Sequence, residues 1–303
     1  MSKQYDIIII GAGPAGLTAA IYARRAAKST LVLEAKTYGG QIINTLDIEN
    51  YPVEPHISGV DFAKKLYNQA TELGAEIEFE KATEIKDNGE LKEVITEDGA
   101  YTAKTVIIAT GSENRKLGLE NEEKLIGRGV SYCATCDGAF YRGKKVAVVG
   151  GGNTALEDAL YLADIAEKVY LIHRRDEFRG AEASVRKLKE KKNIELVLNS
   201  RVTKLIADKK LQSIEVVNKD GSVKKLEADG IFVAIGRTPE TQGFANLIKL
   251  DEAGYIIGSE NCHTNVEGIF VAGDTRTKEL RQLVTATSDG AIAATEAINY
   301  INK

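Results

Sequence analysis

Tyr5 to Gly16 reads YDIIIIGAGPAG, and Lys145 to Ala155 reads KVAVVGGGNTA; these two stretches decide the fold. In each, an apolar run breaks into G-x-G-x-x-G or G-x-G-x-x-A, and a helical pattern and a second apolar run follow. We expect the helices over residues 17–27 and 156–166, and the second strands over 30–34 and 168–173. Near-continuous apolar strands are typical of parallel sheets covered on both faces. The repeat therefore predicts an α/β chain with two Rossmann-like dinucleotide-binding domains, each a parallel sheet with helices.

The segments after each repeated unit predict a small three-stranded insert in each half. The first set of strands is expected over residues 77–79, 91–96 and 105–109, and the second over 194–198, 213–217 and 230–235. The C-terminal segment contains a strand from Ile269, then Gly273-Asp274, and a long helix from about Leu283. Because this tail is too small to stand alone, we expect it to fold back onto the first half.

Length and composition narrow the class of protein. A chain of 303 residues is expected to form about two domains. The net charge of −4 gives no basic excess for nucleic acid, and no apolar run approaches the roughly 18 residues that a membrane helix needs. The N-terminal apolar stretch, Ile7–Ile10, runs directly into glycines, so it does not have the pattern of a signal peptide. These features predict a cytoplasmic protein with neither nucleic acid nor membrane among its partners.

The first glycine motif predicts a dinucleotide site. Gly11 allows a sharp turn after a strand, Gly13 lets the backbone approach a pyrophosphate, and Gly16 lets the following helix pack on the strand. Glu34 ends the second strand, where an acidic group can accept hydrogen bonds from a ribose diol.

After the second motif, Gly150 to Ala155, the second strand does not end in an acidic residue. Here His173, Arg174 and Arg175 take the place of the acid, and Arg179 follows. Arginine binds a phosphate through two hydrogen bonds, whereas a carboxylate repels it, so this half is predicted to bind NADPH in preference to NADH. The alternative is that the arginines pair with Asp176, Glu177 or Glu182. Two dinucleotide sites in one chain suggest one bound flavin and one exchanging nicotinamide.

Cys133 and Cys136 form a C-x-x-C pair between the two motifs. The alternatives are incidental cysteines or half of a zinc site, for which the remaining candidates are the distant Cys262 and His263. Redox chemistry fits better, because such a pair closes a small disulfide ring and commonly lowers one thiol pKa. Asp137 could move a proton to a thiolate leaving group, or it could be a turn residue before Gly138. No metal ion is predicted, and Cys262 is expected to be a small buried residue.

Taken together, these motifs and the segment Cys133-Ala-Thr-Cys-Asp137 resemble low-molecular-weight thioredoxin reductases over essentially the whole chain. Further matching motifs are Gly39-Gly-Gln41, Glu49-Asn-Tyr-Pro52, Ala109-Thr-Gly111 and Arg281-Gln282. The resemblance implies FAD-binding residues at Gly11, Gly13, Pro14, Ala15, Gly16, Glu34, Gly39, Gly40, Gln41, Asn50, Thr110, Gly273, Asp274, Arg281 and Gln282. For NADPH it implies Gly150, Gly152, Asn153, Thr154, His173, Arg174, Arg175 and Arg179.

The resemblance also implies a domain order and a reaction. Residues 1–115 and 246–303 would form a discontinuous FAD domain, and residues 116–245 an NADPH domain that carries the redox pair. NADPH would reduce FAD, FAD would reduce the Cys133–Cys136 disulfide, and the dithiol would reduce oxidised thioredoxin. Cys136 resembles the sulfur nearest the flavin, Cys133 the attacking thiol, and Asp137 the acid.

The resemblance also implies that Arg128 and Phe140 flank the cysteine pair where thioredoxin would dock. The family is homodimeric, and its NADPH domain rotates relative to the FAD domain.

Three alternatives differ in their electron source, their substrate or their class. Some relatives take electrons from ferredoxin and lack a nicotinamide motif, but here Gly150–Ala155 and His173–Arg175 are intact. Another thioredoxin-like carrier could be the substrate. A flavin-binding redox sensor without enzyme activity would have no use for the arginine cluster.

Overall fold

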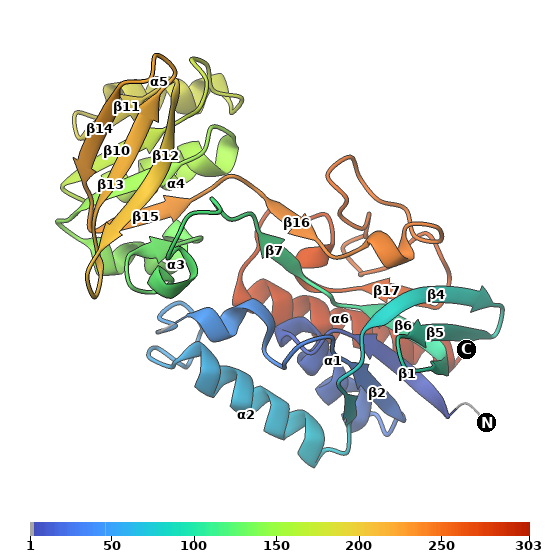
Figure 1. Cartoon of the computed structure of the whole chain (residues 1–303). Helices are drawn as coiled ribbons and strands as arrows, with labels where there is room; N and C mark the ends of the chain where they lie inside the picture. Colours follow the sequence, from blue (N-terminus) through green and yellow to red (C-terminus); the bar gives the residue numbers. More distant parts are fainter. Residues whose placement is uncertain (1–2, 46) are drawn as a thin grey trace. The chain divides into compact units, whose positions relative to one another are not determined.

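The structure is a computed structural model that describes residues 3–45 and 47–303. The chain divides into two compact units, one comprising Met1–Glu113 and Thr238–Lys303 and the other Asn114–Arg237 (Figure 1). The second boundary therefore precedes the expected one at residue 245. The reason is local packing: Phe244 is buried in the core of the first unit, and a Cβ on Gly243 would lie 2.3 Å from the carbonyl oxygen of Thr83.

The first unit is built on a seven-stranded sheet in the order β3-β2-β1-β6-β5-β4, with β17 also paired to β6. Its strands are β1 (Gln4–Ile10), β2 (Thr30–Leu33), β3 (Glu76–Glu78), β4 (Ala82–Asn88), β5 (Leu91–Thr96), β6 (Ala100–Ile108) and β17 (Ile269–Val271). Its helices are α1 (Pro14–Arg25), α2 (Gly59–Glu72) and α6 (Leu283–Ile301), with 3-10 turns η1 (Gly40–Asn44), η4 (Gln242–Phe244) and η5 (Gly273–Thr275). Strands β1, β2, β3, β6 and β17 pair in parallel, whereas β5 pairs antiparallel with β4 and β6.

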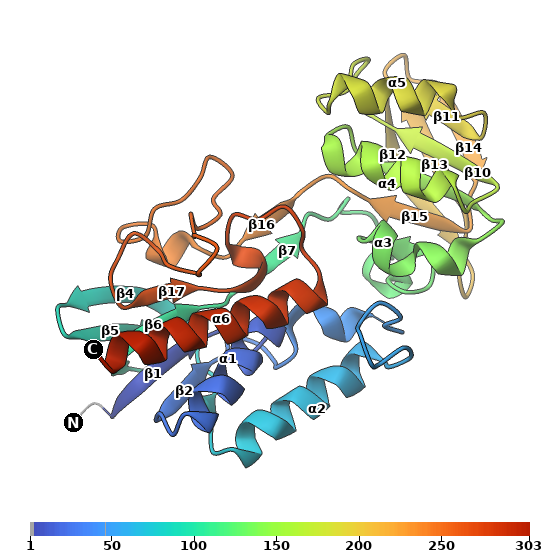
Figure 2. The same cartoon turned by 180° about the vertical axis from the view of Figure 1, so that it is seen from behind.

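The apolar run Ile7–Ile10 is buried on both sides of this sheet, as expected of a central parallel strand. Ile7 and Ile9 face the core beneath α1 and α6, which lie side by side in both views (Figures 1 and 2). Ile8 and Ile10 face the opposite core, which includes residues of β4, β5 and the segment from Phe244 to Ile256. The pairing of β17 with β6 confirms that the C-terminal tail folds back onto the first half.

The second unit has a five-stranded parallel sheet in the order β11-β10-β9-β15-β8 and a separate three-stranded antiparallel sheet, β12-β13-β14. The parallel strands are β8 (Val130–Ser131), β9 (Lys145–Val149), β10 (Lys168–Ile172), β11 (Ile194–Val197) and β15 (Gly230–Val233). The antiparallel strands are β12 (Ser200–Ala207), β13 (Leu211–Asn218) and β14 (Val223–Glu227). The helices are α3 (Ala134–Asp137), α4 (Asn153–Ala163) and α5 (Glu182–Glu190), with 3-10 turns η2 (Glu123–Leu125) and η3 (Gly138–Tyr141). Two short strands, β7 (Ser112–Asn114) and β16 (Arg237–Pro239), form the two chain connections between the units.

The α/β class with two parallel sheets is confirmed, but the predicted membership of the inserts is wrong in part. The strands expected at residues 194–198 and 230–235 belong to the parallel sheet as β11 and β15, and only β13 lies in the three-stranded sheet. The strands expected at 77–79, 91–96 and 105–109 all belong to the seven-stranded sheet of the first unit, as β3, β5 and β6, and do not form a separate insert. The partners of β13 were missed because β14 is mostly exposed and β12 mixes its buried Val202 and Leu205 with exposed polar residues, without a clean alternation.

Candidate functional site

The first glycine motif forms the turn between β1 and α1. Gly11 has φ of +110°, and a Cβ there would lie 2.4 Å from the carbonyl oxygen of Ala109. A Cβ on Gly16 would lie 1.8 Å from the carbonyl oxygen of Gly11, so both positions require glycine. A Cβ on Gly13, the N-cap of α1, would meet nothing within 4 Å. The turn therefore leaves open space in front of the N-terminus of α1, where a diphosphate can approach backbone N–H groups.

Glu34 follows β2 and turns back toward this motif. Its carboxylate accepts hydrogen bonds from the backbone N–H of Ala12, at 2.7 Å, and of Lys36, at 2.9 Å. The predicted ribose-binding acid thus lies directly beside the glycine turn.

Two other predicted flavin segments also reach the turn. The N–H of Gly39 donates to the carbonyl oxygen of Ala12 at 2.8 Å, and a Cβ on Gly40 would lie 3.4 Å from Cα of Gly13. Gln41 follows in η1 and is exposed. Far apart in sequence, the amide of Asn50 donates to Oε1 of Gln282 at 3.1 Å, at the start of α6.

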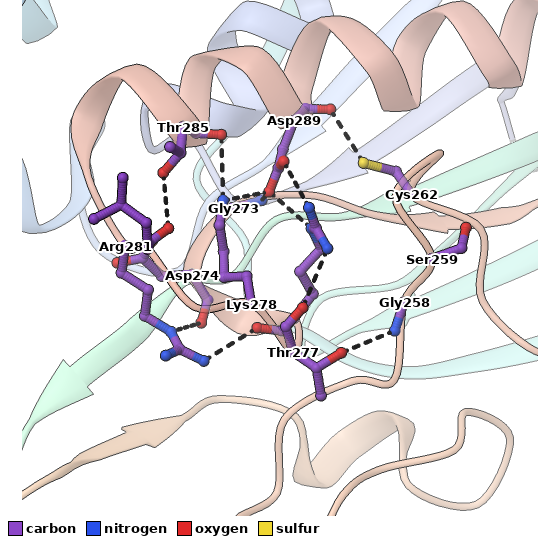
Figure 3. A network of polar contacts seen from close by, with 12 residues as sticks. Gly258, Ser259, Cys262, Gly273, Asp274, Thr277, Lys278, Arg281, Thr285 and Asp289 are labelled. Carbon is purple, nitrogen blue, oxygen red and sulfur yellow. Dashed lines mark hydrogen bonds and ion pairs between the residues drawn. The ribbon is translucent and has the colours of Figure 1, made fainter. Parts of the chain in front are cut away.

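The remaining predicted flavin residues follow β6 or lie in the segment before α6. The hydroxyl of Thr110 lies 3.1 Å from that of Thr275. A Cβ on Gly273 would lie 2.9 Å from Cβ of Ala15, so the Gly273-Asp274 turn packs against the first turn of α1. The guanidinium of Arg281 lies 4.2 Å from the ring centroid of Tyr255, and its Nε donates to the carbonyl oxygen of Asp274 at 3.4 Å (Figure 3). All the predicted flavin residues lie in the first unit.

The second glycine motif repeats this geometry in the second unit. A Cβ on Gly150 would lie 2.3 Å from the carbonyl oxygen of Ala234, whereas one on Gly152, the N-cap of α4, would meet nothing within 4 Å. Oδ1 of Asn153 accepts the N–H of Ala181 at 2.7 Å, and Thr154 is exposed in the first turn of α4. This unit therefore also presents an open helix N-terminus to a pyrophosphate.

His173 differs from the three arginines with which it was grouped. It is 5% exposed, its ring stacks on Phe178 with centroids 5.4 Å apart, and a Cβ on Gly151 would lie 2.1 Å from the ring. Burial, together with the nearby arginines, lowers the pKa of His173, so it is neutral rather than cationic near pH 7. His173 therefore packs beneath the glycine turn and supports its backbone at Gly151.

Arg174, Arg175 and Arg179 are exposed at this end of the sheet. Within residues 3–45 and 47–303, no ion pair joins them to Asp176, Glu177 or Glu182. The backbone N–H of Arg179 donates to the carbonyl oxygen of Gly151 at 2.7 Å, which ties the arginine segment to the glycine turn. Three cationic side chains thus border the second motif.

Cys133 and Cys136 form a disulfide with Cα atoms 5.3 Å apart, so their sulfurs are bonded to each other rather than held apart as zinc ligands. Cys133 is the N-cap of the short helix α3, and Asp137 ends that helix. The hydroxyl of Ser131 donates to Oδ2 of Asp137 at 2.7 Å and accepts the N–H of Cys133 at 3.1 Å. Burial raises the pKa of Asp137, and the hydrogen bond from Ser131 opposes this rise.

Ser131 was not among the predicted site residues. The available signal was its position two residues before Cys133, where a serine hydroxyl can bond the local backbone. Its hydroxyl oxygen contacts both the backbone of Cys133 and the carboxylate of Asp137, so Ser131 links the two ends of the segment 133–137, called the redox segment below.

The redox segment packs against the far end of α4 from the glycine motif. A Cβ on Gly138 would lie 2.7 Å from the ring of Tyr161 and 3.2 Å from Leu162. Gly152, at the other end, caps the N-terminus of the same helix. At 1.5 Å per residue the two contacts are separated by roughly 14 Å along the helix axis. The third cysteine, Cys262, is buried in the first unit, as expected, and burial raises its pKa to about 12.

Comparison with known proteins agrees with these features over almost the full length. Residues 5–290 match the family model described as pyridine nucleotide-disulphide oxidoreductase. A thioredoxin reductase of Listeria innocua is 45% identical over 303 residues, which are 99% of this chain and 95% of the relative. A thioredoxin reductase of Bacillus subtilis is 43% identical over 303 residues, which are 99% of this chain and 96% of the relative. The crystal structure of thioredoxin reductase from Streptococcus pyogenes superposes with a TM-score of 0.95 at 41% identity, covering 100% of this chain and 99% of that chain. Among the described residues, none of the helices combines the length and apolar character needed to cross a bilayer.

Proposed function

Since the chain belongs to the pyridine nucleotide-disulphide oxidoreductase family, we propose that it is a thioredoxin-disulfide reductase that uses NADPH and FAD. The observation that carries this proposal is the Cys133–Cys136 disulfide, which has a partly buried carboxyl group beside it. It lies in the same unit as a glycine motif bordered by Arg174, Arg175 and Arg179.

FAD fits the first unit. The open helix N-terminus at Gly13 would take its diphosphate, and Glu34 would accept from the adenosine ribose. Gly39–Gln41, Asn50, Thr110, Gly273-Asp274 and Arg281-Gln282 are the remaining segments proposed to hold it. When bound, FAD accepts a hydride and passes two electrons to sulfur.

NADPH fits the second unit. Gly150 and Gly152 open the N-terminus of α4 to the pyrophosphate, and the three arginines would bind the 2′-phosphate. Asn153, Thr154 and His173 complete the set, and His173 would act by supporting Gly151.

We propose that the disulfide is first reduced and then transfers its electrons to thioredoxin by thiol–disulfide exchange. Two electrons and two protons convert the Cys133–Cys136 disulfide to a dithiol. The thiolate of Cys133 attacks the disulfide of oxidised thioredoxin and forms a mixed disulfide, and the partner sulfur leaves as a thiolate. Asp137, whose pKa is raised by burial, donates a proton to a thiolate leaving group. Cys136 then attacks Cys133, which releases reduced thioredoxin and restores the disulfide.

This route requires the second unit to move. The disulfide and the nicotinamide must each come within the roughly 3–3.5 Å of the flavin that reacting atoms need, and the two groups cannot occupy one flavin face together at that distance. We infer that the unit rotates on its two connections, near residues 116–119 and 237–243, in a hinge motion. Arg128 and Phe140 are proposed to contact thioredoxin, and Phe140 is 41% exposed.

We further propose a cytoplasmic homodimer. Supply of electrons by ferredoxin is disfavoured by the intact second glycine motif and its three arginines. Another thioredoxin-like carrier remains the second candidate substrate, because the disulfide chemistry is the same.

The test is anaerobic reduction followed by turnover. Protein loaded with FAD is mixed with NADPH and then with oxidised thioredoxin, and the flavin absorbance and thioredoxin thiols are followed. We expect NADPH to bleach the flavin, and thioredoxin to restore its colour while gaining two thiols. A flavin that NADPH does not reduce, or that is reduced without reducing any of several thioredoxins, would contradict the proposal.

A further inference from the structure

A buried carboxylate holds the backbone of the Gly273-Asp274 turn. Asp289, on α6, accepts the N–H of Gly273 at 3.0 Å (Figure 3). The same carboxylate accepts from Arg276 Nε at 2.9 Å and Nη2 at 3.0 Å, and from Lys278 Nζ at 2.7 Å. The three charged side chains are at most 7% exposed. Neither Asp289 nor these cations has a part in the proposed electron route.

The turn that Asp289 holds needs this support. Gly273 has φ of +77°, a left-handed conformation, and it is buried. A buried backbone N–H without an acceptor is costly, so the turn keeps this shape only where an acceptor faces it. Asp289 provides that acceptor from a helix, which is a rigid element.

The same region of α6 also contacts the glycine turn of the first motif. A Cβ on Gly290 would lie 2.2 Å from the carbonyl oxygen of Ala15, and one on Gly273 would lie 2.9 Å from Cβ of Ala15. The first turn of α1, the Gly273-Asp274 turn and α6 therefore meet at one point, and Asp289 is the side chain that joins the last two.

Stability alone is a weak reason for this arrangement. A buried ion cluster is often no more stable than apolar residues of the same volume. Burial opposes ionisation of Asp289, but the hydrogen bonds from Arg276 and Lys278 outweigh it and lower the pKa, so the group is ionised at neutral pH. Two cations and one anion leave one net positive charge in the cluster.

We propose that Asp289 is a positioning residue of the flavin site: through the N–H of Gly273 it fixes the Gly273-Asp274 turn against Ala15 before the dinucleotide binds. This inference rests on the proposed binding of FAD. It predicts that the turn is ordered in the protein without flavin, and that the loss of the acceptor at position 289 weakens FAD binding.

Two double variants isolate the hydrogen bond to Gly273. Arg276→Met with Asp289→Asn keeps an oxygen that can accept the N–H of Gly273, and Arg276→Met with Asp289→Leu removes it. Both remove one cation and one anion, so both keep the net charge of the natural cluster. Equilibrium binding of FAD to each apoprotein, and the visible circular dichroism of bound flavin, are measured.

We expect the Leu variant to bind FAD about tenfold more weakly than the Asn variant, as for the loss of one hydrogen bond to a buried group. Its flavin dichroism should also differ from that of the natural protein, and the Asn variant should restore it. Glu296→Gln is the matched control, because Glu296 lies on the same helix but pairs with His263 on the surface. Equal FAD affinity and equal dichroism in the two double variants would overturn the inference.

A measurement on the natural chain covers the case in which both variants fail to fold. Hydrogen exchange of the natural apoprotein should show the amide of Gly273 protected without FAD; exchange as fast as in an exposed loop would overturn the inference. If the natural chain binds no FAD at all, the proposed function fails instead, and the two failures are thus distinguishable.

Discussion

Replacement of Arg174, Arg175 and Arg179 by alanine should remove the preference for NADPH over NADH. A charge-assisted hydrogen bond contributes about 1.5–3 kcal/mol. The three side chains are exposed, so solvent screening favours the lower end of this range for each. No carboxylate of the described residues forms an ion pair with them. No competing ion pair therefore reduces the free energy that their contacts with the phosphate contribute.

Three such contacts would sum to about 4.5 kcal/mol, but groups that share one phosphate are not additive. We therefore expect the ratio of kcat/KM for NADPH over NADH to fall about 100- to 1,000-fold in the triple variant, and roughly tenfold in a single variant.

The assay is stopped-flow reduction of the flavin by each nucleotide at fixed ionic strength. The matched control replaces Lys187, Lys189 and Lys192, which are exposed cations of the same unit, and should leave the ratio unchanged. The reasoning is refuted if the arginine variant keeps the natural ratio, or if the lysine variant loses it to the same extent.

Cys133→Ser and Cys136→Ser should each abolish thioredoxin reduction in the turnover assay while NADPH still bleaches the flavin; failure of that bleaching in both folded variants would contradict the electron order. Asp137→Asn should slow thioredoxin reduction. For the natural protein we expect this activity to decline as the pH rises through the raised pKa of Asp137, and the variant should lose that decline. Because a raised pKa means that the folded state binds this proton more tightly, ionisation of Asp137 reduces stability as the pH rises above about 3.9; Asp137→Asn should therefore melt at a higher temperature at pH 7 and not at pH 3, and an equal shift at both would argue against burial as the cause. A cross-link that fixes the two units with the disulfide at the flavin should block flavin reduction by NADPH without releasing FAD, and unimpaired reduction would exclude the hinge.

The sequence predicted both nucleotide motifs because their glycines answer local requirements. Gly11 needs a positive φ, and Gly16 and Gly150 lie where a side chain would collide with backbone. The apolar runs at Ile7–Ile10 and Val146–Val149 likewise revealed the buried parallel strands. Such features depend on a few neighbouring residues, so they can be read along the chain.

Other features depend on residues that are distant in sequence. The neutral state of His173 arises from its burial beneath Gly151, and no local pattern distinguishes it from the arginines that follow. Strand β14 is mostly exposed and β12 has an irregular apolar pattern, so their pairing with β13 becomes visible only in the sheet.

Ser131 and Asp289, one in each unit, were not predicted, and they differ in how far away their partners lie. The partners of Ser131, Cys133 and Asp137, are only two and six residues away, so its position gave a local signal. Asp289 was one polar residue in a long helix, and its partner Gly273 lies before the start of that helix. The sequence by itself determined where nucleotides can approach the backbone, because that needs only the absence of side chains. The tertiary structure alone decided which side chains hold those turns and shift the pKa values, because burial and hydrogen bonding arise when separate segments pack together.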